Sequence, residues 1–349
     1  MCIPCVSLAV PLERHKKSSL SEICVRDLRR AVVEKFAKAS RFLVKCQIVE
    51  PYVESGLLYG AVCPCEMASG WPVLEDFHDT LEAIWVWACY AKLSGDRSFD
   101  GRLSSAVGYA ASNAPRFLVP ENRSLYYDCS HVLLATIALE RARGDERLRQ
   151  AASKSARLLA KYLASLREMR GREYGDPWWM AACLSWYARH RGDSGLLDFT
   201  RRLVSEHLLQ AKERFNRLED EPAHVGPGGH DFFSSNANRA LALVASLGTD
   251  AGRILEKELL PLLPSRFVER HADENAWNAH AASAMAAAYR IAKRSEFLRA
   301  FDAIARELER RDRGEGSLPR SRGFPLGESW VAFFVCFAYL NLVADPAEI

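Results

Sequence analysis

The stretch Trp71–Asp96, WPVLEDFHDTLEAIWVWACYAKLSGD, decides the fold of this 349-residue chain. Asp76 and Asp79 stand near a helix start, where acceptor side chains satisfy unpaired backbone N–H groups. The segment Ile84–Ala88 that follows is apolar on nearly every face, a pattern typical of a helix buried on all sides. Gly95 then ends the helix, because glycine adopts the left-handed backbone conformation without strain. The stretch therefore predicts one buried helix with a defined start and end.

The same pattern recurs along the rest of the chain. Closing turns lie near residues 95, 144, 192, 248 and 294, so the period is close to fifty residues. Self-similarity at such a spacing indicates a repeat architecture. Further apolar helices are predicted over residues 127–143, from residue 176 to the turn at 192, and over 231–247, 275–293 and 328–343. Amphipathic helices are predicted over residues 21–46 and 99–113, from the turn at 144 to about 169, and over 196–215, 254–263 and 297–310.

Each repeat pairs one apolar helix with one amphipathic helix, and this pairing predicts the architecture. Apolar helices are best buried in an inner ring, while amphipathic helices lie outside and face water on one side. We therefore expect an all-α fold, an (α/α)6 barrel in which six helical hairpins close a ring. A single domain is expected over residues 19–349, after an irregular arm over residues 1–18.

Loop lengths predict which end of the ring carries function. The turns from inner to outer helices span two to four residues, whereas the connections from outer to inner helices are long. All long loops therefore lie at the end where the inner helices begin, which we call the mouth. Long connections in a compact domain are more often functional than idle. These connections are residues 115–126, 170–175, 216–230, 266–274 and 314–327.

Carboxylates and a histidine at the starts of the inner helices suit acid–base chemistry. Glycoside cleavage needs one acid to protonate the leaving oxygen and one carboxylate to activate water or to attack. The alternative role for each carboxylate is that of a helix N-cap. The catalytic candidates are Asp76, Asp79, Asp128, Asp231, Glu328 and His131.

Aromatic and further polar residues fall in the same layer of the predicted ring. The aromatic side chains suit stacking on sugar rings, with wedge packing of the core as the alternative. Asn238 lies two turns into an apolar helix, where an unpaired amide would be costly, so it predicts a polar cavity or a buried water. The substrate-binding candidates are Trp71, His78, Tyr127, Trp178, Trp179, His230, Asn238, Trp277, Asn278, His280 and Trp330.

The phrase A-x-x-x-G-D, over Ala91–Asp96 and Ala188–Asp193, and the count of twelve helices resemble the six-hairpin toroid enzymes. Those include glycoside hydrolases, unsaturated-uronate hydrolases and sugar epimerases, and the resemblance implies an active site at the mouth. The segment Asp76–Thr80 is also similar to the D-x-D-D-T motif of class II terpene cyclases, which share a toroid. His78 stands where that motif has its central proton-donating Asp, and those cyclases use two such domains.

Three functions follow from these observations. The first is a carbohydrate-active enzyme, a glycoside hydrolase or related sugar-processing enzyme with mouth carboxylates as general acid and base. The second is a toroid acting on an isoprenoid, and the third is a non-catalytic binding scaffold of the same fold. The polar residues Ser235, Asn238 and Asn278 favour the first over the second, because an isoprenoid chamber needs apolar walls. We therefore expect an enzyme with a small-molecule or oligosaccharide substrate.

Composition limits the partners and the compartment. A net charge of +3 gives no long-range field that would favour nucleic acid. The longest apolar run, residues 330–340, is too short to span a bilayer, so we expect no membrane partner and a cytoplasmic protein. The three glutamines beside abundant charged residues indicate a thermophile. We find no fingerprint of a cofactor and predict no metal among the catalytic groups.

The ten cysteines are not among the candidate groups at the mouth. The pairs Cys2/Cys5 and Cys63/Cys65 have three open readings: a four-thiolate zinc site, disulfides that tie the arm to the ring, or free thiols. The cysteines inside inner helices read as small core residues. These are Cys89, Cys129, Cys183 and Cys336.

Overall fold

The computed structural model describes residues 25–49, 58–65, 77–167, 169, 176–209, 232–263, 275–314, 316–319 and 326–349. This part of the chain is helical, and its β-pairing is confined to isolated bridges. The predicted N-terminal arm lies outside the described residues. The helices are α1 (Val25–Cys46), α2 (Phe77–Ser94), α3 (Asp100–Phe117), α4 (Leu125–Arg143), α5 (Arg149–Ser165), α6 (Pro177–Arg191), α7 (Ser194–Leu209), α8 (Phe232–Leu247), α9 (Ala251–Ile254), α10 (Asn275–Ala292), α11 (Ser295–Arg311) and α12 (Ser329–Val343).

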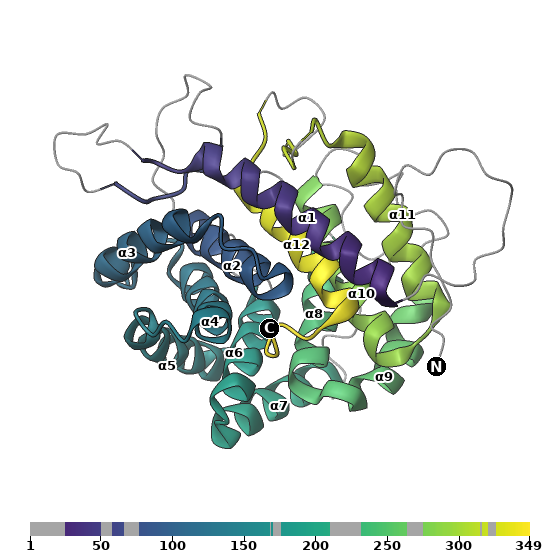
Figure 1. Ribbon diagram of the computed structural model, residues 1–349. Coiled ribbons are helices and arrows are strands. Elements are labelled where there is room, and N and C mark those ends of the chain that lie inside the picture. The colour runs from purple at the N-terminus through teal and green to yellow at the C-terminus, as the bar shows by residue number, and fades with distance from the viewer. Residues whose placement is uncertain are drawn as a thin grey trace, which may run out of the picture.

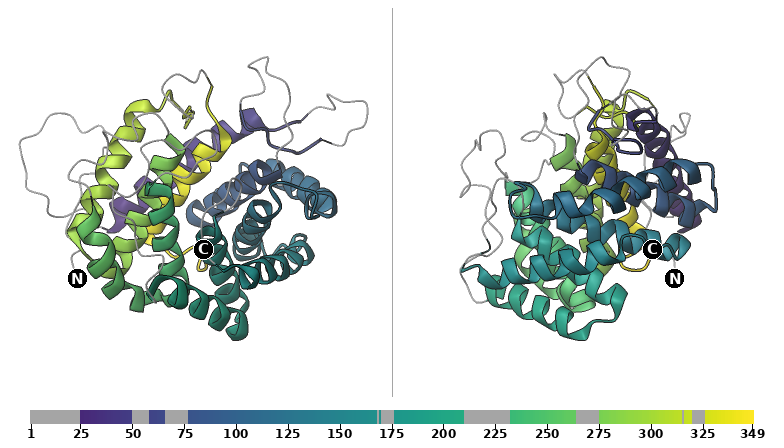
Figure 2. Two further views of the ribbon diagram at one scale, coloured as in Figure 1. Left: turned by 180° about the vertical axis from the view of Figure 1, so that it is seen from behind. Right: turned by 90° about the vertical axis from the view of Figure 1, so that its left-hand side faces the viewer.

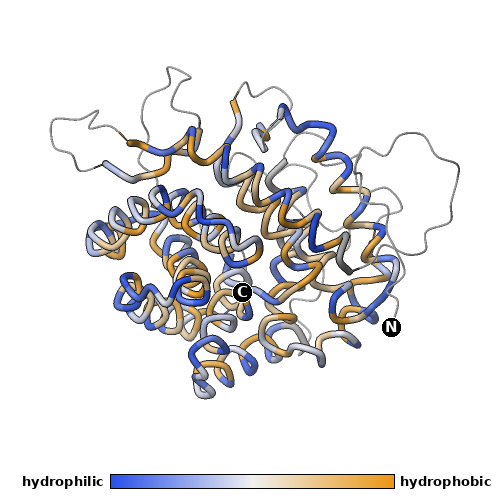
Figure 3. Tube along the Cα trace, viewed as in Figure 1, coloured by the Kyte–Doolittle hydropathy of each residue, from blue (hydrophilic) through white to orange (hydrophobic). Residues whose placement is uncertain are grey.

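The helices form the two concentric layers that the sequence predicts (Figure 1). The even-numbered helices α2 to α12 pack side by side in chain order, and α12 returns to contact α2, which closes the ring (Figure 2). The odd-numbered helices lie outside, and α1 covers α12 and α2. Hydropathy follows the layers, since α2 and α12 are largely hydrophobic while the outer α11 carries a long hydrophilic face (Figure 3). The structure confirms the all-α (α/α)6 fold.

Aromatic side chains fill the centre of the ring. Phe337 of α12 lies 5.5 Å from the Trp85 ring of α2 and 5.6 Å from the Trp186 ring of α6, measured between ring centroids. Phe333, one turn earlier on α12, packs edge-on against Trp85 at 5.2 Å. These inner helices therefore meet through their side chains across the middle of the ring. Among the described residues, no helix has the length and apolarity needed to span a bilayer.

The fifth outer helix differs from the prediction. A regular helix is expected over residues 254–263. Instead the α-helix α9 ends at Ile254, and a π-helical turn over Leu255–Leu259 follows it. A 3-10 turn over Leu260–Leu262 then ends the element. Pro261 lacks a backbone N–H and so cannot continue the α-helical hydrogen-bond ladder. The wider π turn just before it changes the hydrogen-bond register within one short element.

The turns that close the inner helices have the predicted backbone. Gly95, Gly144 and Gly192 have φ of 76°, 66° and 67°, and the amide of Gly144 donates to the Glu140 carbonyl at 2.8 Å. Lys293 takes the same left-handed conformation at the end of α10, with φ of 58°. A non-glycine residue adopts the left-handed conformation only at an energetic cost, so the packing of the hairpin must impose this turn geometry at Lys293.

Substitution at one of these glycines tests whether the turn requires a left-handed backbone. Gly192→Ala is expected to lower the unfolding free energy by about 1–2 kcal/mol, because an added Cβ meets no atom within 4 Å and only the backbone strain remains. Gly108→Ala is the matched control, since Gly108 lies inside α3 with open space around it and no positive φ. That substitution should stabilise by about 0.5–1 kcal/mol. Denaturant unfolding measures both, and equal effects would contradict the turn assignment.

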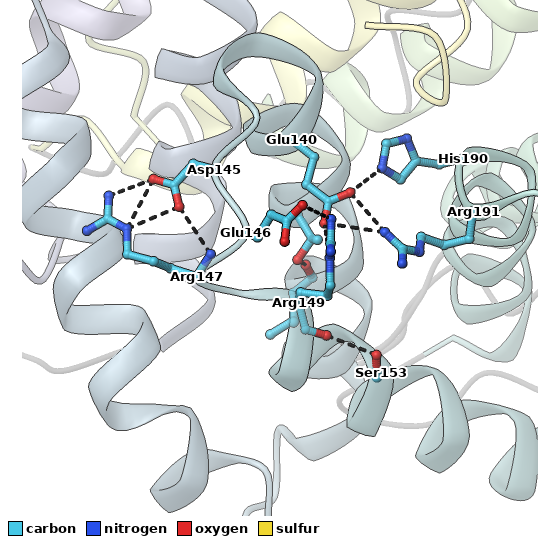
Figure 4. Close-up of polar contacts among 10 residues, drawn as sticks. Glu140, Asp145, Glu146, Arg147, Arg149, Ser153, His190 and Arg191 are labelled. Atoms are coloured by element: carbon cyan, nitrogen blue, oxygen red, sulfur yellow. Dashed lines mark hydrogen bonds and ion pairs between the residues drawn. The ribbon is translucent and has the colours of Figure 1, made fainter.

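An ionic cluster joins α4, α5 and α6 (Figure 4). Glu140 and Arg191 stand in the last turns of the inner helices α4 and α6, so the cluster lies at the end opposite the mouth. The Glu140 carboxylate accepts from His190 Nε2 at 2.8 Å, from Arg149 Nε at 3.0 Å and from Arg191 Nη1 at 3.2 Å. Burial raises the pKa of Glu140, but the hydrogen bonds from His190 and Arg149 outweigh burial, so the net pKa is lowered. The cluster therefore favours ionised Glu140 in the folded state.

The C-terminal segment closes the same end of the ring. Asp345 accepts from Arg189 of α6 at 3.0 Å and from Arg290 of α10 at 3.1 Å. Arg141 of α4 donates to the carbonyl of Ala347 at 3.1 Å. The segment thus links three inner helices beyond their C-terminal ends, which leaves the mouth as the end that carries the predicted site.

Glu140→Gln tests the ionic cluster through its pH dependence. At pH 7 the substitution should cost about 1.5–3 kcal/mol of unfolding free energy, because it removes a charged acceptor. The folded pKa is lowered, so the contribution of Glu140 is complete above the unfolded value of about 4.3 and is lost as pH falls through the folded value. The difference between wild type and variant, measured by urea unfolding, should shrink below about pH 4. A difference that stays constant with pH would contradict this assignment.

Candidate functional site

The inner-helix starts bring carboxylates together at the mouth, and only some of them are caps. Asp176 is a cap, since its carboxylate accepts from the backbone N–H of Trp178 at 2.7 Å. Glu328 occupies the N-cap position of α12, but its side chain caps nothing and accepts from the indole N–H of Trp330. Asp79 and Asp128 are also buried, and their carboxylates contact side chains of other segments. Capping therefore does not account for these three predicted residues.

His78 lies between two of these carboxylates. Its Nδ1 is 3.2 Å from Asp128 Oδ1 on α4, and its Nε2 is 3.8 Å from Asp79 Oδ2. The imidazole is 15% exposed, whereas both carboxylates are 2% exposed, so the ring is the accessible member of the group. Tyr127 of α4 packs edge-on against it at 4.8 Å. We call Asp79, His78 and Asp128 the outer layer of the site.

Neutral donors fix the remaining oxygens of the outer layer. The hydroxyl of Ser329, the first residue of α12, donates to Asp79 Oδ1. The amide of Asn122 donates to Asp128 Oδ2 at 2.6 Å and to the Phe117 carbonyl at 2.8 Å. Each carboxylate therefore has one oxygen held by a neutral donor and the other directed toward His78. This geometry orients both acids before any ligand binds.

A second acid–imidazole pair lies one helical turn deeper. Glu82 Oε1 is 3.1 Å from His131 Nε2, and both side chains are at most 1% exposed. His131 is a predicted site residue, but Glu82 is missed because it stands inside an apolar run. Its spacing of three residues from Asp79 and four from His78 places it on the same face of α2 and could have identified it. We call Glu82 and His131 the inner layer.

The far side of the mouth carries a third polar contact. His280 Nε2 of α10 bonds the side-chain oxygen of Asn238 on α8, and both residues are buried. The amide predicted to need a cavity or a water therefore has a direct partner. Trp179 of α6 lies between the two halves of the mouth, with its ring 5.9 Å from His131 and 5.3 Å from His280. Asn278 is half-buried near the start of α10.

The aromatic candidates divide into core and mouth residues. Trp178 and Trp179 are 0% and 2% exposed, which leaves neither ring a free face for a sugar. The structure places these two rings in the core, against the stacking prediction. Tyr127 and Trp330 are half-buried and keep accessible surface beside the carboxylates. Trp71, Asp76, His230 and Asp231 lie outside the described residues, as does the side chain of Trp277.

The inner-helix cysteines are core thiols, as predicted. Cys89, Cys129, Cys183 and Cys336 are buried and free. Burial raises the pKa of Cys89 well above its usual value and that of Cys129 to about 12, so neither forms a thiolate near neutral pH. Cys2 and Cys5 lie outside the described residues, where the zinc and disulfide alternatives stay predictions. Within the described ranges, no group of three or more acidic, His or Cys side chains is arranged to hold a metal ion.

Comparison with known proteins identifies related folds. No family model and no curated protein sequence matches this chain. Among solved structures, it is similar to unsaturated glucuronyl hydrolase from Streptococcus agalactiae, with a TM-score of 0.60 and 12% identity over 92% of this chain and 93% of that one. It is also similar to the GH76A alpha-1,6-mannanase from Salegentibacter sp., with a TM-score of 0.63 and 11% identity over 90% and 98%.

A third similar structure is unsaturated glucuronyl hydrolase from Bacillus sp. GL1, with a TM-score of 0.53 and 17% identity over 90% of this chain and 96% of that one. All three similarities extend over nearly the whole of both chains. At these identities they show a shared fold, the (α/α)6 toroid of glycoside and uronyl hydrolases. A shared fold does not by itself define an activity.

Proposed function

We propose that this chain hydrolyses a glycosidic bond at its mouth, with Asp79 and Asp128 as the general acid–base pair. The proposal rests on the outer layer, in which His78 lies between carboxylates from two neighbouring inner helices. Glycoside hydrolysis needs two carboxyl groups that flank the scissile bond in different protonation states. An imidazole between two acids can hold a proton on either ring nitrogen and so supports unequal states.

The substrate class follows from the folds that this chain resembles and from its own mouth. One similar structure holds the Streptococcus agalactiae hydrolase complexed with dGlcA-GalNAc6S, an oligosaccharide. In this chain Tyr127 and Trp330 lie half-buried beside the carboxylates, where they suit stacking against a sugar ring. We propose an oligosaccharide substrate and a cytoplasmic setting. Asp231, Glu328 and the other candidates, apart from the buried Trp178 and Trp179, stay predicted contributors.

The polar mouth argues against an isoprenoid substrate. Four described polar groups, Asp79, Glu82, Asp128 and His131, lie buried at the starts of α2 and α4. An isoprenoid needs a chamber with apolar walls, and buried charge there would be costly without polar partners in the ligand. The competing account is a binding scaffold of the same fold, which predicts sugar binding without turnover.

The experiment assays the chain against unsaturated glucuronyl disaccharides and α-1,6-linked mannooligosaccharides. Asp128→Asn should lower kcat/KM on the hydrolysed substrate by about 10²–10⁴, because it removes one member of the acid–base pair. Its Tm should stay within about 3 °C of wild type, since Asn122 and His78 can still bond the amide. Product release by chromatography and scanning calorimetry measure the two effects.

Asp176→Asn is the matched control, because Asp176 is a carboxylate at an inner-helix start that acts as a cap. It should keep its activity and lose at most about 1 kcal/mol of stability. Turnover that survives Asp128→Asn, or falls equally in both variants, would contradict the assignment of the outer layer. Sugar binding with no turnover in the wild type would favour the scaffold instead.

A further inference from the structure

The inner layer carries a feature that glycoside hydrolysis by the outer layer does not require. Glu82 and His131 form an acid–imidazole pair at 3.1 Å inside the ring, with both side chains at most 1% exposed. The arrangement mirrors the outer layer above it. On α2 the histidine is His78 and the acid is Glu82, whereas on α4 the acid is Asp128 and the histidine is His131. Each imidazole of one helix therefore faces a carboxyl group of the other helix.

The hydrogen bond on the other ring nitrogen fixes part of the protonation state. His131 Nδ1 lies 2.9 Å from the backbone carbonyl oxygen of Tyr127. A carbonyl oxygen only accepts, so Nδ1 must carry a hydrogen. The open question is then confined to Nε2, which lies 3.1 Å from Glu82 Oε1. Nε2 carries a hydrogen if the pair is ionised, and the Glu82 carboxyl group carries it if the pair is neutral.

The surroundings of the His131 ring bias the choice between these two states. Three aromatic rings lie about His131, with centroids at 4.3 Å for Tyr127, 5.5 Å for Phe333 and 5.9 Å for Trp179. A cation over the face of an aromatic ring, within about 6 Å of its centroid, is attracted by the ring quadrupole. Asp128 lies one turn above on the same face of α4, and a nearby carboxylate also favours the charged imidazole. Burial of both groups opposes charge separation, whereas these two effects favour proton transfer to His131.

We propose that Glu82 and His131 are positioning residues of this site, with Glu82 holding His131 as an imidazolium beneath the two acids of the outer layer. The fixed cation offsets their negative charge, and its ring orientation seats Tyr127, which packs against His78. The kinetic consequence rests on the proposed glycoside hydrolysis, whereas the protonation state does not. The His78 ring of α2 lies 6.2 Å from the His131 ring, and Asp79 and Ser329 lie beside His78 in the outer layer. His280 of α10 lies on the other side of Trp179.

Nitrogen-15 NMR of the histidine side chains tests the protonation state in the full chain. Both nitrogens of His131 should carry hydrogens from pH 5.5 to 8.5 in the wild type, with the signals assigned by their loss in His131→Gln. In Glu82→Gln, Nε2 should lose its hydrogen at a pH at least about one unit lower, because the partner carboxylate is gone. An unprotonated Nε2 in the wild type at pH 7 would overturn the proposal, even if Glu82→Gln failed to fold.

The kinetic readout separates positioning from stability. In Glu82→Gln the alkaline limb of the kcat profile should move to lower pH by about one unit, because His131 now loses its charge there. Glu140→Gln is the matched control, since Glu140 pairs with His190 at 2.8 Å at the opposite end of the ring. It should lose stability and keep the wild-type profile. The same shift of the alkaline limb in both variants, or no shift in Glu82→Gln, would overturn the proposal. If the wild type shows no turnover at all, glycoside hydrolysis is refuted and the NMR result alone decides this inference.

Discussion

The structure depends on burying helices that are apolar on every face. Such a helix cannot lie at a surface, so each inner helix is covered by its two ring neighbours, by an outer helix and by side chains from across the ring. Phe337 lies at the centre of this packing, in contact with the Trp rings of α2 and α6. The outer helices need only one apolar face, and the hydropathy of α11 shows this clearly (Figure 3). Ring closure is thus a consequence of hydrophobic burial rather than of any single contact.

That burial sets the terms for polar groups in the inner helices. A polar side chain there has no water to bond, so it needs a protein partner. Thr136 and Ser185 bond backbone carbonyls of their own helices, whereas several acids, imidazoles and amides reach a neighbouring helix. Asp79 bonds Ser329 of α12, Glu82 pairs with His131 of α4, and Asn238 bonds His280 of α10. The polar contacts concentrate near the starts of these helices, and so the mouth becomes a connected set of acids, imidazoles and hydroxyl donors. The candidate site follows from the same constraint that holds the fold.

The sequence predicts the fold well because the relevant signals are local. Apolar runs, the fifty-residue period and glycines such as Gly144 and Gly192 specify where each hairpin begins and turns. The break after Ile254 is harder to predict, because the switch to π and 3-10 turns depends on how that short element packs. Lys293 in a left-handed conformation shows the same limit, since nothing in its type indicates the turn.

The site is predicted less completely, and the reason is tertiary. Asp176 and Asp128 both stand at the start of an inner helix, yet one caps its own helix and the other reaches His78 on α2. Nothing in the local sequence separates these roles, because the difference lies in which neighbouring helix each carboxylate faces. Glu82 is missed for a related reason, since its partner His131 is forty-nine residues away in the chain.

The most direct measurement is a crystal structure of the Asp128→Asn chain with a bound oligosaccharide. The account predicts a glycosidic bond at the mouth, with its oxygen within hydrogen-bond distance of Asp79 or of residue 128 and a sugar ring against Tyr127 or Trp330. An oligosaccharide bound elsewhere on the ring, with His78 still enclosed between the two carboxyl positions and out of contact with the sugar, would contradict it.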